Sequence, residues 1–222
     1  MIIAIDGPAG AGKSTIAKIL AQKLGFLYID TGAMYRALTL KVIEKGLPVD
    51  DLNGIIHLAK QTKIELLHDS CTAELKVLLD GNDVSKSIRE TRVTKFVSDV
   101  AKIKEVREIM LGLQRKLGLS TNSILDGRDI GTVVFPDAQK KIFLDANFQE
   151  RTLRRYKELK DSGYPVSLQE IENDLSNRDK IDSTRETAPL KKADDAILVD
   201  TTSLSIDQVV DKILNILNSP NE

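Results

Sequence analysis

Residues 1–14 decide the fold, because MIIAID (residues 1–6) runs directly into GPAGAGKS (residues 7–14). The first six residues are a short, almost continuous apolar run of β-formers, which predicts a strand buried on both faces. Beyond the glycines, Ile16, Leu20 and Leu24 recur at helical spacing and Gly25 provides a C-terminal stop. The sequence therefore predicts a strand, a tight loop and an amphipathic helix in direct succession.

The glycine-rich segment fits the pattern G-x-x-x-x-G-K-[ST] and lies in the strand-to-helix context that this motif requires. Its glycines allow a tight turn with inward N–H groups, and the following helix contributes its positive end. Lys13 adds a full charge, and the Ser14 hydroxyl suits Mg²⁺. A loop that only connects a strand to a helix would not need these two residues in this order. We therefore expect a nucleoside triphosphate site formed by Gly7, Pro8, Ala9, Gly10, Ala11, Gly12, Lys13, Ser14 and Thr15.

The segments that follow indicate a parallel sheet. Residues 26–29 predict a second strand, and Thr31 can cap a helix that continues to Gly46. A β-α-β-α start is typical of a parallel sheet with helices on its faces. We therefore expect an α/β, three-layer P-loop fold with a central parallel sheet, formed as one domain over residues 1–222.

The middle of the chain changes character. Residues 64–67 and 74–79 predict short strands, and Asp80-Gly81-Asn82-Asp83 is a strong turn sequence, so we expect a small antiparallel insert. Apolar residues at helical spacing from Val93 to Leu117 predict one long or kinked helix. The other expected elements are strands at 123–125, 141–144 and 197–199, helices at 149–160 and 168–178, and a last helix capped by Ser205 with Gln208.

The composition limits the classes of function. The 222 residues include 32 Lys and Arg against 33 Asp and Glu, so any anion binding must be local. The 4 Tyr and 5 Phe form no interleaved basic stripe, which argues against nucleic acid binding. With Cys71 as the single cysteine and no apolar run long enough to span a bilayer, we expect a cytoplasmic protein with no membrane partner. We also expect a monomer.

The triphosphate motif is shared by GTPases, motor ATPases and small-molecule kinases, so a second criterion is needed. The guanine-reading pattern Asn-Lys-x-Asp is absent, and the nearest string, at residues 177–180, has the wrong order. Motor ATPases carry a longer apolar stretch ending in an acidic residue than the one at 124–126. A kinase of a small acceptor is the class that remains.

Single arginines at turns and segment ends support that class: Arg36, Arg128, Arg178 and Arg185. Phosphoryl transfer between two phosphate-bearing molecules collects negative charge at one centre, and cations must come from several segments to surround it. The planar guanidinium group suits this task because it binds two phosphate oxygens at once. A lone arginine is more often a solvated surface residue, so it is the combination of these four that supports the class.

At these residues the sequence resembles the bacterial cytidylate kinase family. The matching segments, in chain order, are IDGPAGAGKST, IDTGAMYRA, LDGRDIGTVVFPDA, KIFLDA and the region up to TAPL. The resemblance covers about Ile2 to Val210, and the second and third segments are highly specific. It implies ATP-dependent phosphorylation of CMP and dCMP to the diphosphates, with ATP and Mg²⁺. It also implies a monophosphate-binding insert over about residues 60–96 and a mobile lid over about 148–165.

The resemblance also assigns roles to single residues. Arg36, Arg128 and Arg185 would hold the acceptor phosphate. Arg178 would lie near phosphate and sugar, with Asp182 at the sugar hydroxyls. Cytosine would be read by Ser98, Arg107 and Asp129, which matches the donors and the acceptor that a selective pocket requires. The expected acceptor site therefore comprises Thr31, Tyr35, Arg36, Ser98, Arg107, Arg128, Asp129, Arg178, Asp182 and Arg185.

The catalytic residues expected on the same basis are Lys13, Arg128, Arg185 and Arg154. The lid segment also holds Arg151 and Arg155, and helix-surface charge is the alternative for all three lid arginines. The Mg²⁺ ligand would be Ser14, with Asp126 as the candidate second ligand, although aspartates beside Gly127 can be simple turn-formers.

Several alternatives stay open at this stage. Ser98 and Arg107 could be plain surface residues of a long helix, and Tyr35 could be ordinary helix packing rather than a wall for the nucleoside. At the level of function, the alternatives to a CMP/dCMP kinase are a kinase for another monophosphate or small alcohol, and a non-catalytic module that binds a nucleotide.

Overall fold

The computed structural model describes residues 1–68 and 75–218. Its larger sheet has the order β2-β6-β1-β7-β8, and all four strand pairs are parallel. The strands are β1 (Ile2–Asp6), β2 (Leu27–Asp30), β6 (Ser123–Gly127), β7 (Lys140–Asp145) and β8 (Ile197–Asp200). The central parallel sheet predicted from the sequence is confirmed, and β1 lies at its middle as a fully covered strand.

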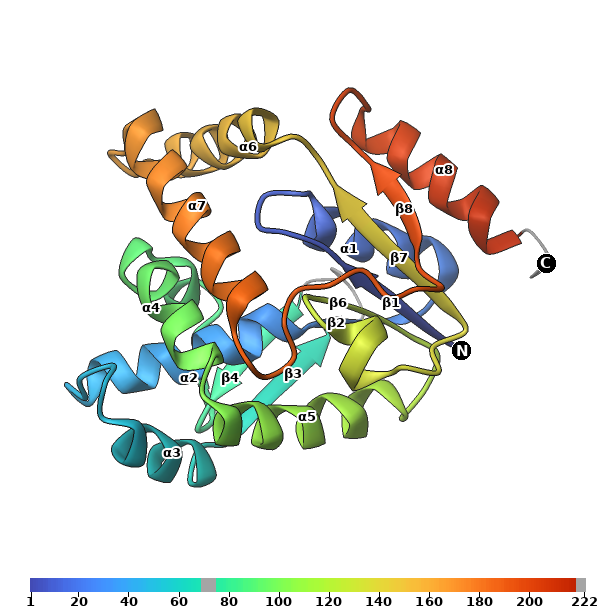
Figure 1. The fold of residues 1–222 in the computed structure, drawn as a ribbon. Coiled ribbons are helices and arrows are strands. Elements are labelled where there is room, and N and C mark those ends of the chain that lie inside the picture. Colours follow the sequence, from blue (N-terminus) through green and yellow to red (C-terminus); the bar gives the residue numbers. More distant parts are fainter. Residues whose placement is uncertain (69–74, 219–222) are drawn as a thin grey trace.

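Both faces of this sheet are covered, as the continuous apolar runs of its strands predict. Ile3 and Ile5 of β1 pack on one face against α1 (Lys13–Leu24) and α8 (Ile206–Asn218). Ala4 points to the opposite face, towards α5 (Lys104–Gly118) and the π-helical turn η2 (Ile130–Val134). This arrangement is the three-layer α/β fold expected from the sequence (Figure 1).

A second core is organised around α2 (Thr31–Glu44). Its Met34, Leu38 and Leu40 are completely buried among residues of neighbouring elements. These elements are α3 (Leu52–Lys60), the antiparallel sheet of β3 (Ile64–His68), β4 (Leu75–Leu79) and β5 (Asn82–Asp83), the short η1 (Ser87–Arg89), and α4 (Thr91–Ala101). The antiparallel insert is therefore present, and it lies beside the parallel sheet (Figure 1).

The insert differs in detail from its prediction. Asp80 and Gly81 form the expected turn with φ of 49° and 87°, but Asn82 and Asp83 continue as β5 and pair with β4. Residues 69–74, which include Cys71 and the predicted start of a strand at residue 74, lie outside the described residues.

Three helix boundaries also differ. The N-cap of α2 is Asp30, whose carboxylate accepts a 2.8 Å hydrogen bond from the Ala33 N–H, while the hydroxyl of the predicted cap Thr31 donates to the Asp126 carbonyl. The predicted helix over 93–117 is two helices, α4 and α5, which separate at Ile103. The helix predicted to end at residue 178 is α7 (Leu168–Thr184), because a capping box at Ser167 starts it and no breaker follows Arg178.

The remaining helices agree with the prediction. The segment predicted at 149–160 is α6 (Phe148–Asp161). The Ser205 hydroxyl and the Gln208 side chain each accept the other residue's N–H, as the capping-box pattern predicts. Among residues 1–68 and 75–218, no helix is both long and apolar enough to cross a membrane.

Two glycines with positive φ give a matched test of the backbone. Gly25 has φ 67° and open space where a Cβ would be, whereas a Cβ on Gly7, with φ 147°, would overlap the carbonyl oxygen of Leu144. Gly25→Ala should lower the free energy of unfolding by about 1 kcal/mol, the usual cost of the left-handed conformation. Gly7→Ala should lower the free energy of unfolding by at least twice as much. Urea denaturation measures both variants. Equal losses would contradict the proposed close approach of the loop to β7.

Candidate active site

Three strand ends meet at one edge of the parallel sheet. In its register Asp6 of β1 lies beside Gly127 of β6, and Asp126 of β6 lies beside Asp30 of β2. The glycine-rich loop, the Arg128–Asp129 segment and the start of α2 leave the sheet from these positions. In open α/β sheets this edge is the usual place for a ligand site.

The glycine-rich loop wraps the N-terminus of α1. Gly7, Gly10 and Gly12 all have positive φ, and Gly12 directly precedes the first helical residue. The buried Lys13 ammonium donates a 2.7 Å hydrogen bond to the Pro8 carbonyl. Burial, followed by the nearby Arg128, lowers the pKa of Lys13. An anion at the mouth of this loop would meet the helix N-terminus and the lysine together.

The middle of the loop is fixed from outside by two helices. Arg151 of α6 donates a 2.9 Å hydrogen bond to the Ala9 carbonyl, and the Ala9 N–H donates to Asp179 of α7 at 3.3 Å. Arg151 and Asp179 also form an ion pair. A Cβ on Gly10 would lie 2.9 Å from the Arg151 carbonyl oxygen, so only glycine fits the loop at this position.

Ser14 and Asp126 lie together in front of the loop. The Ser14 hydroxyl donates to one carboxylate oxygen of Asp126 at 2.7 Å, and the Tyr28 hydroxyl donates to the other at 3.0 Å. Asp126 is 4% exposed, and burial together with the charge of Asp30 raises its pKa to about 6. Asp126 is therefore no simple turn-former.

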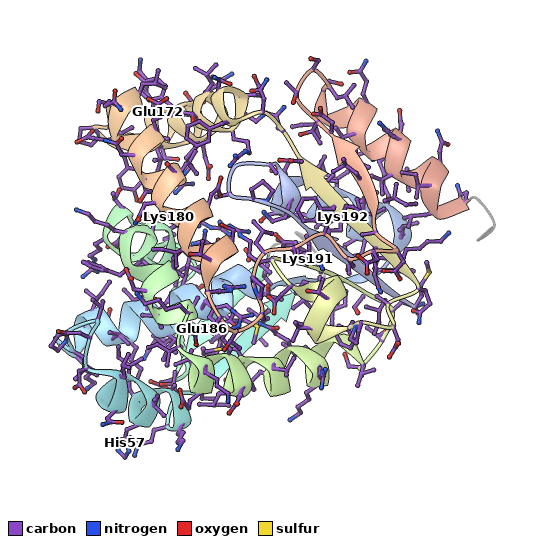
Figure 2. All side chains as sticks on the ribbon, viewed as in Figure 1. His57, Glu172, Lys180, Glu186, Lys191 and Lys192 are labelled. Atoms are coloured by element: carbon purple, nitrogen blue, oxygen red, sulfur yellow. The ribbon has the colours of Figure 1, made fainter. Side chains whose placement is uncertain are left out.

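This donor set fits Mg²⁺, which takes one or two protein oxygens together with phosphates and waters. Within residues 1–68 and 75–218 no cluster of three or more His, Cys, Asp or Glu could hold a metal by itself. His57 is exposed on α3, far from the strand ends (Figure 2). The residues present therefore suit a cation held mainly by a phosphate chain.

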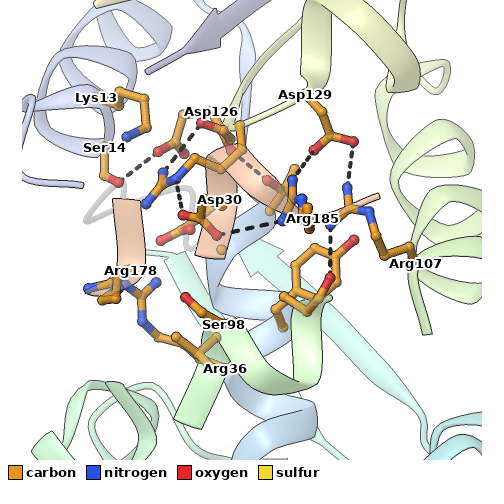
Figure 3. A pocket seen from close by; sticks show the side chains of 18 residues that line it. Lys13, Ser14, Asp30, Arg36, Ser98, Arg107, Asp126, Asp129, Arg178 and Arg185 are labelled. Atoms are coloured by element: carbon orange, nitrogen blue, oxygen red, sulfur yellow. Dashed lines mark hydrogen bonds and ion pairs between the residues drawn. The ribbon is translucent and has the colours of Figure 1, made fainter. Parts of the chain in front are cut away.

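A pocket continues from Lys13 and Ser14 between α2, α4 and the end of α7 (Figure 3). The structure brings together in its lining all ten residues expected at the acceptor site: Thr31, Tyr35, Arg36, Ser98, Arg107, Arg128, Asp129, Arg178, Asp182 and Arg185.

The arginines of the pocket differ in their partners. Arg128 donates a 2.8 Å hydrogen bond to Asp182, and Arg185 lies 3.6 Å from both Asp129 and Asp182. Arg36 and Arg178, in contrast, form no hydrogen bond or ion pair with any described residue. Arg178 is 6% exposed with its Nε unpaired, and burial with its cationic neighbours lowers its pKa to about 10. A buried charge without a partner is costly, so this part of the pocket calls for an anion.

The far end of the pocket combines charged hydrogen-bonding groups with an aromatic side chain. Arg107 pairs with Asp129, donates to the Ala101 carbonyl at 3.2 Å, and lies 5.4 Å from the centre of the Tyr35 ring. Ser98 and Arg107 are only 5% and 6% exposed, so neither is a plain surface residue. The Nε of Arg107 is buried without a partner. Tyr35 both packs in the core and lines the pocket, and burial raises its pKa to about 12.

The expected catalytic residue Arg154 does not reach the pocket. Its guanidinium binds the hydroxyl and carbonyl oxygens of Thr201 at 3.0 and 2.6 Å and Glu150 at 2.8 Å. Arg155 instead lines a groove at the mouth of the loop together with Lys13 and Arg36. Consecutive helical residues point in directions about 100° apart, which separates these two side chains.

The sequence prediction missed two carboxylates at the strand ends. Asp30 caps α2, lies 3.3 Å from Arg89 and lines the pocket. Asp6 accepts hydrogen bonds from the Ile130 and Gly131 N–H groups. Their positions at the ends of predicted strands were a usable signal for proximity to the site, but their partners come from distant segments.

The fold and the site together define a P-loop kinase. A sequence model of the family described as "Cytidylate kinase" matches residues 3–219, and the chain belongs to this cytidylate kinase family. It is 54% identical over 215 residues to "Cytidylate kinase" of Alkaliphilus oremlandii (strain OhILAs), covering 97% of this chain and 96% of that protein. It is 50% identical over 222 residues to "Cytidylate kinase" of Carboxydothermus hydrogenoformans, covering 100% and 99%.

Among solved structures the chain is similar in fold to a shikimate kinase from Bacteroides thetaiotaomicron. The TM-score is 0.51 at 12% identity, with 99% of each chain covered. A sugar kinase from Janibacter gives a TM-score of 0.50 at 13% identity, with 98% of this chain and 94% of that chain covered. At these identities the likeness concerns the fold alone.

The raised pKa of Asp126 predicts a pH-dependent effect on stability. Because this pKa is raised from 3.8 to about 6, the stability that Asp126 contributes at low pH is lost as the pH rises through about 6. Asp126→Asn should therefore gain about 2 kcal/mol of unfolding free energy relative to the parent protein between pH 4.5 and pH 7.5. Urea denaturation at both pH values measures this difference. A difference between variant and parent that is the same at both pH values would contradict the assignment.

Proposed function

We propose that this chain transfers the γ-phosphoryl group of ATP to CMP or dCMP, giving CDP or dCDP and ADP. One observation carries the proposal: a pocket that holds the buried Arg178 and the half-buried Arg36, neither of them paired with a described residue, has Lys13 and Ser14 of the triphosphate loop at one end and Ser98, Arg107 and Asp129 at the other. The nearly full-length similarity to cytidylate kinases supports the same acceptor.

In this proposal residues 7–15 bind the triphosphate of ATP. The loop amides and the N-terminus of α1 take the phosphate oxygens, and Lys13 leaves the Pro8 carbonyl to bind the same chain. Ser14 and Asp126 would hold Mg²⁺, which supplies neutralisation of the β- and γ-phosphate charge when bound. Asp126 sits between two hydroxyl donors, so its carboxylate is oriented before the ligand arrives.

The acceptor phosphate would lie at Arg36 and Arg178, which form no hydrogen bond or ion pair within residues 1–68 and 75–218. Arg128 and Arg185 close the opposite side, and their ion pairs with Asp182 hold them in place. The chemistry then needs no side-chain nucleophile, because phosphoryl transfer depends on positioning and charge neutralisation. Asp182, with its Arg128 contact at 2.8 Å, is placed for the sugar hydroxyls.

Cytosine would be read at the far end of the pocket. Arg107 and Ser98 supply donors for its carbonyl and ring nitrogen, and Asp129 accepts from its amino group. An ionised carboxylate has about four acceptor sites, so Asp129 can keep its ion pairs while it binds the base. Uracil would present a carbonyl to the Asp129 carboxylate, which disfavours it strongly.

The larger organisation follows from the same proposal. The insert over residues 60–96 would carry the monophosphate-binding side of the cleft, and residues 148–165 would act as a lid that excludes water from the transferring phosphate. The contact of Arg151 with the Ala9 carbonyl gives this segment a direct connection to the phosphate loop. We further propose a cytoplasmic monomer that does not act on nucleic acid, in keeping with its formal charge of -1.

An acceptor panel tests the function. ADP release is measured with ATP and Mg²⁺ and, in turn, CMP, dCMP, UMP, AMP, GMP and no acceptor. We expect CMP and dCMP to exceed UMP by at least about 100-fold in kcat/KM, because the wrong base leaves buried polar groups unpaired. A preference for another acceptor would indicate a different kinase. ATP binding without transfer to any acceptor would indicate a non-catalytic module.

A matched pair of variants tests the lid arginine. Arg155→Gln removes a cation that shares the groove with Lys13 and Arg36, and it should lower kcat by about 100-fold. Arg154→Gln removes a cation that binds Thr201, and it should leave kcat within about three-fold of the parent protein. Steady-state assays with CMP measure both. A larger loss in Arg154→Gln than in Arg155→Gln would reverse the assignment.

A further inference from the structure

Asp6 is a buried carboxylate to which the proposed chemistry gives no role. It is the last residue of β1, it directly precedes the glycine-rich loop, and it is 5% exposed. Its two carboxylate oxygens accept hydrogen bonds from the N–H groups of Ile130 at 2.8 Å and Gly131 at 2.7 Å. One side chain therefore connects the strand that leads into the phosphate loop with the segment that follows β6.

The two amides that Asp6 binds are the first of the π-helical turn η2. The first amides of a helix have no partner within it, and the side chain of the N-cap residue usually binds one of them. Here the N-cap residue is Asp129, and its side chain makes no capping hydrogen bond. Asp129 instead points into the pocket, where it pairs with Arg107 and Arg185.

Asp6, at the end of β1, thus caps η2 in place of Asp129. If Asp129 had to cap η2 itself, its carboxylate would turn towards its own backbone and leave Arg107 without its charge partner. The segment has little room to adjust, because a Cβ on Gly127 would lie 2.7 Å from the Ile130 side chain. Residues 127–131 are therefore held from both sides, and Arg128 and Asp129 lie between the two fixed points.

The electrostatics of Asp6 fit a role in the site. Burial, with a smaller contribution from the charge of Asp129, raises its pKa to about 6, against the opposing effects of the Gly131 and Ile130 N–H groups and of Lys13. Asp6 is therefore an ionisable group kept at a desolvated position between the phosphate-loop lysine and a pocket carboxylate. An apolar residue there would avoid this desolvation, but it would leave two buried amides unpaired.

We propose that Asp6 is a positioning residue for acceptor recognition, which caps the 130–134 turn from β1 and so releases Asp129 to organise the base-reading end of the pocket. The inference rests on the proposed function, because its effect is expected in the choice between CMP and UMP. It goes beyond that function by assigning the geometry of Arg128 and Asp129 to a residue that touches neither substrate.

The test compares Asp6→Asn with Asp51→Asn. Asp51 is a matched control because its carboxylate caps α3 by accepting the Gly54 N–H at 2.9 Å, outside the site. In Asp6→Asn the side-chain NH₂ group faces a backbone N–H group, so η2 loses one of its two hydrogen bonds to residue 6. We expect the KM for CMP to rise and the CMP-to-UMP ratio of kcat/KM to fall, each by at least about ten-fold. The KM for ATP should stay within about three-fold, and Asp51→Asn should leave all three values unchanged.

Two further variants separate positioning from charge and from folding. Asp6→Glu keeps the charge but adds a methylene, so it should lose CMP selectivity as Asp6→Asn does. Asp6→Ser is smaller and can still accept one N–H, which keeps the test available if Asp6→Asn does not fold. Urea denaturation identifies the variants that are folded before their kinetics are compared.

A double-mutant cycle gives the decisive reading. If Asp6 acts through Asp129, adding Asp6→Asn to Asp129→Ala should change the CMP-to-UMP ratio by less than about two-fold. Additive losses, an unchanged ratio in folded Asp6→Asn, or a KM for ATP that rises as much as that for CMP would each overturn the inference. A parent enzyme that does not prefer CMP to UMP would instead overturn the proposed function, so the two failures are distinguishable.

Discussion

The structure depends on an excess of positive charge held in a buried pocket. Six basic side chains line it, and four aspartates oppose them. The imbalance is concentrated at Arg36 and Arg178, which pair with no carboxylate in the part of the chain that the structure describes. A phosphate monoester, which carries about 1.5 to 2 negative charges at neutral pH, would supply the missing negative charge. The rest of the site can be understood as the means of bringing these cations from distant segments to one place and holding them apart until a nucleotide arrives.

Much of the fold could be predicted because the signals are local. The apolar run of β1, the positive-φ glycines and the spacing of Ile16 and Leu20 each act within a few residues. The helix boundaries that were predicted wrongly have different physical causes. Asp30 and Thr31 can both cap a helix, and the choice is made by the Asp126 carbonyl, which binds the Thr31 hydroxyl from another strand. The end of α7 was missed because its polar sequence has little periodicity to mark a boundary.

The residues that line the pocket could be predicted from the sequence, but the pairing of their side chains could not. The matched motifs suffice to nominate residues such as Arg128 and Asp129, and the pocket contains both. Which carboxylate pairs with which arginine depends on where the end of α7 lies relative to Arg128 and Asp129, which no local pattern encodes. Arg154 illustrates the limit most clearly. A run of arginines on one helix identifies the helix, but a rotation of about 100° between neighbours decides which of them lines the groove with Lys13 and Arg36.

Helix α2 belongs to both halves of the molecule. Its second turn carries Tyr35 and Arg36 into the pocket, whereas Met34, Leu38 and Leu40 pack in the second core. The 14 residues of α2 form one continuous helix, which joins these two groups of side chains. A shift of the second core relative to the parallel sheet would therefore also move Tyr35 and Arg36, so that opening of the cleft and release of a bound acceptor would be mechanically coupled.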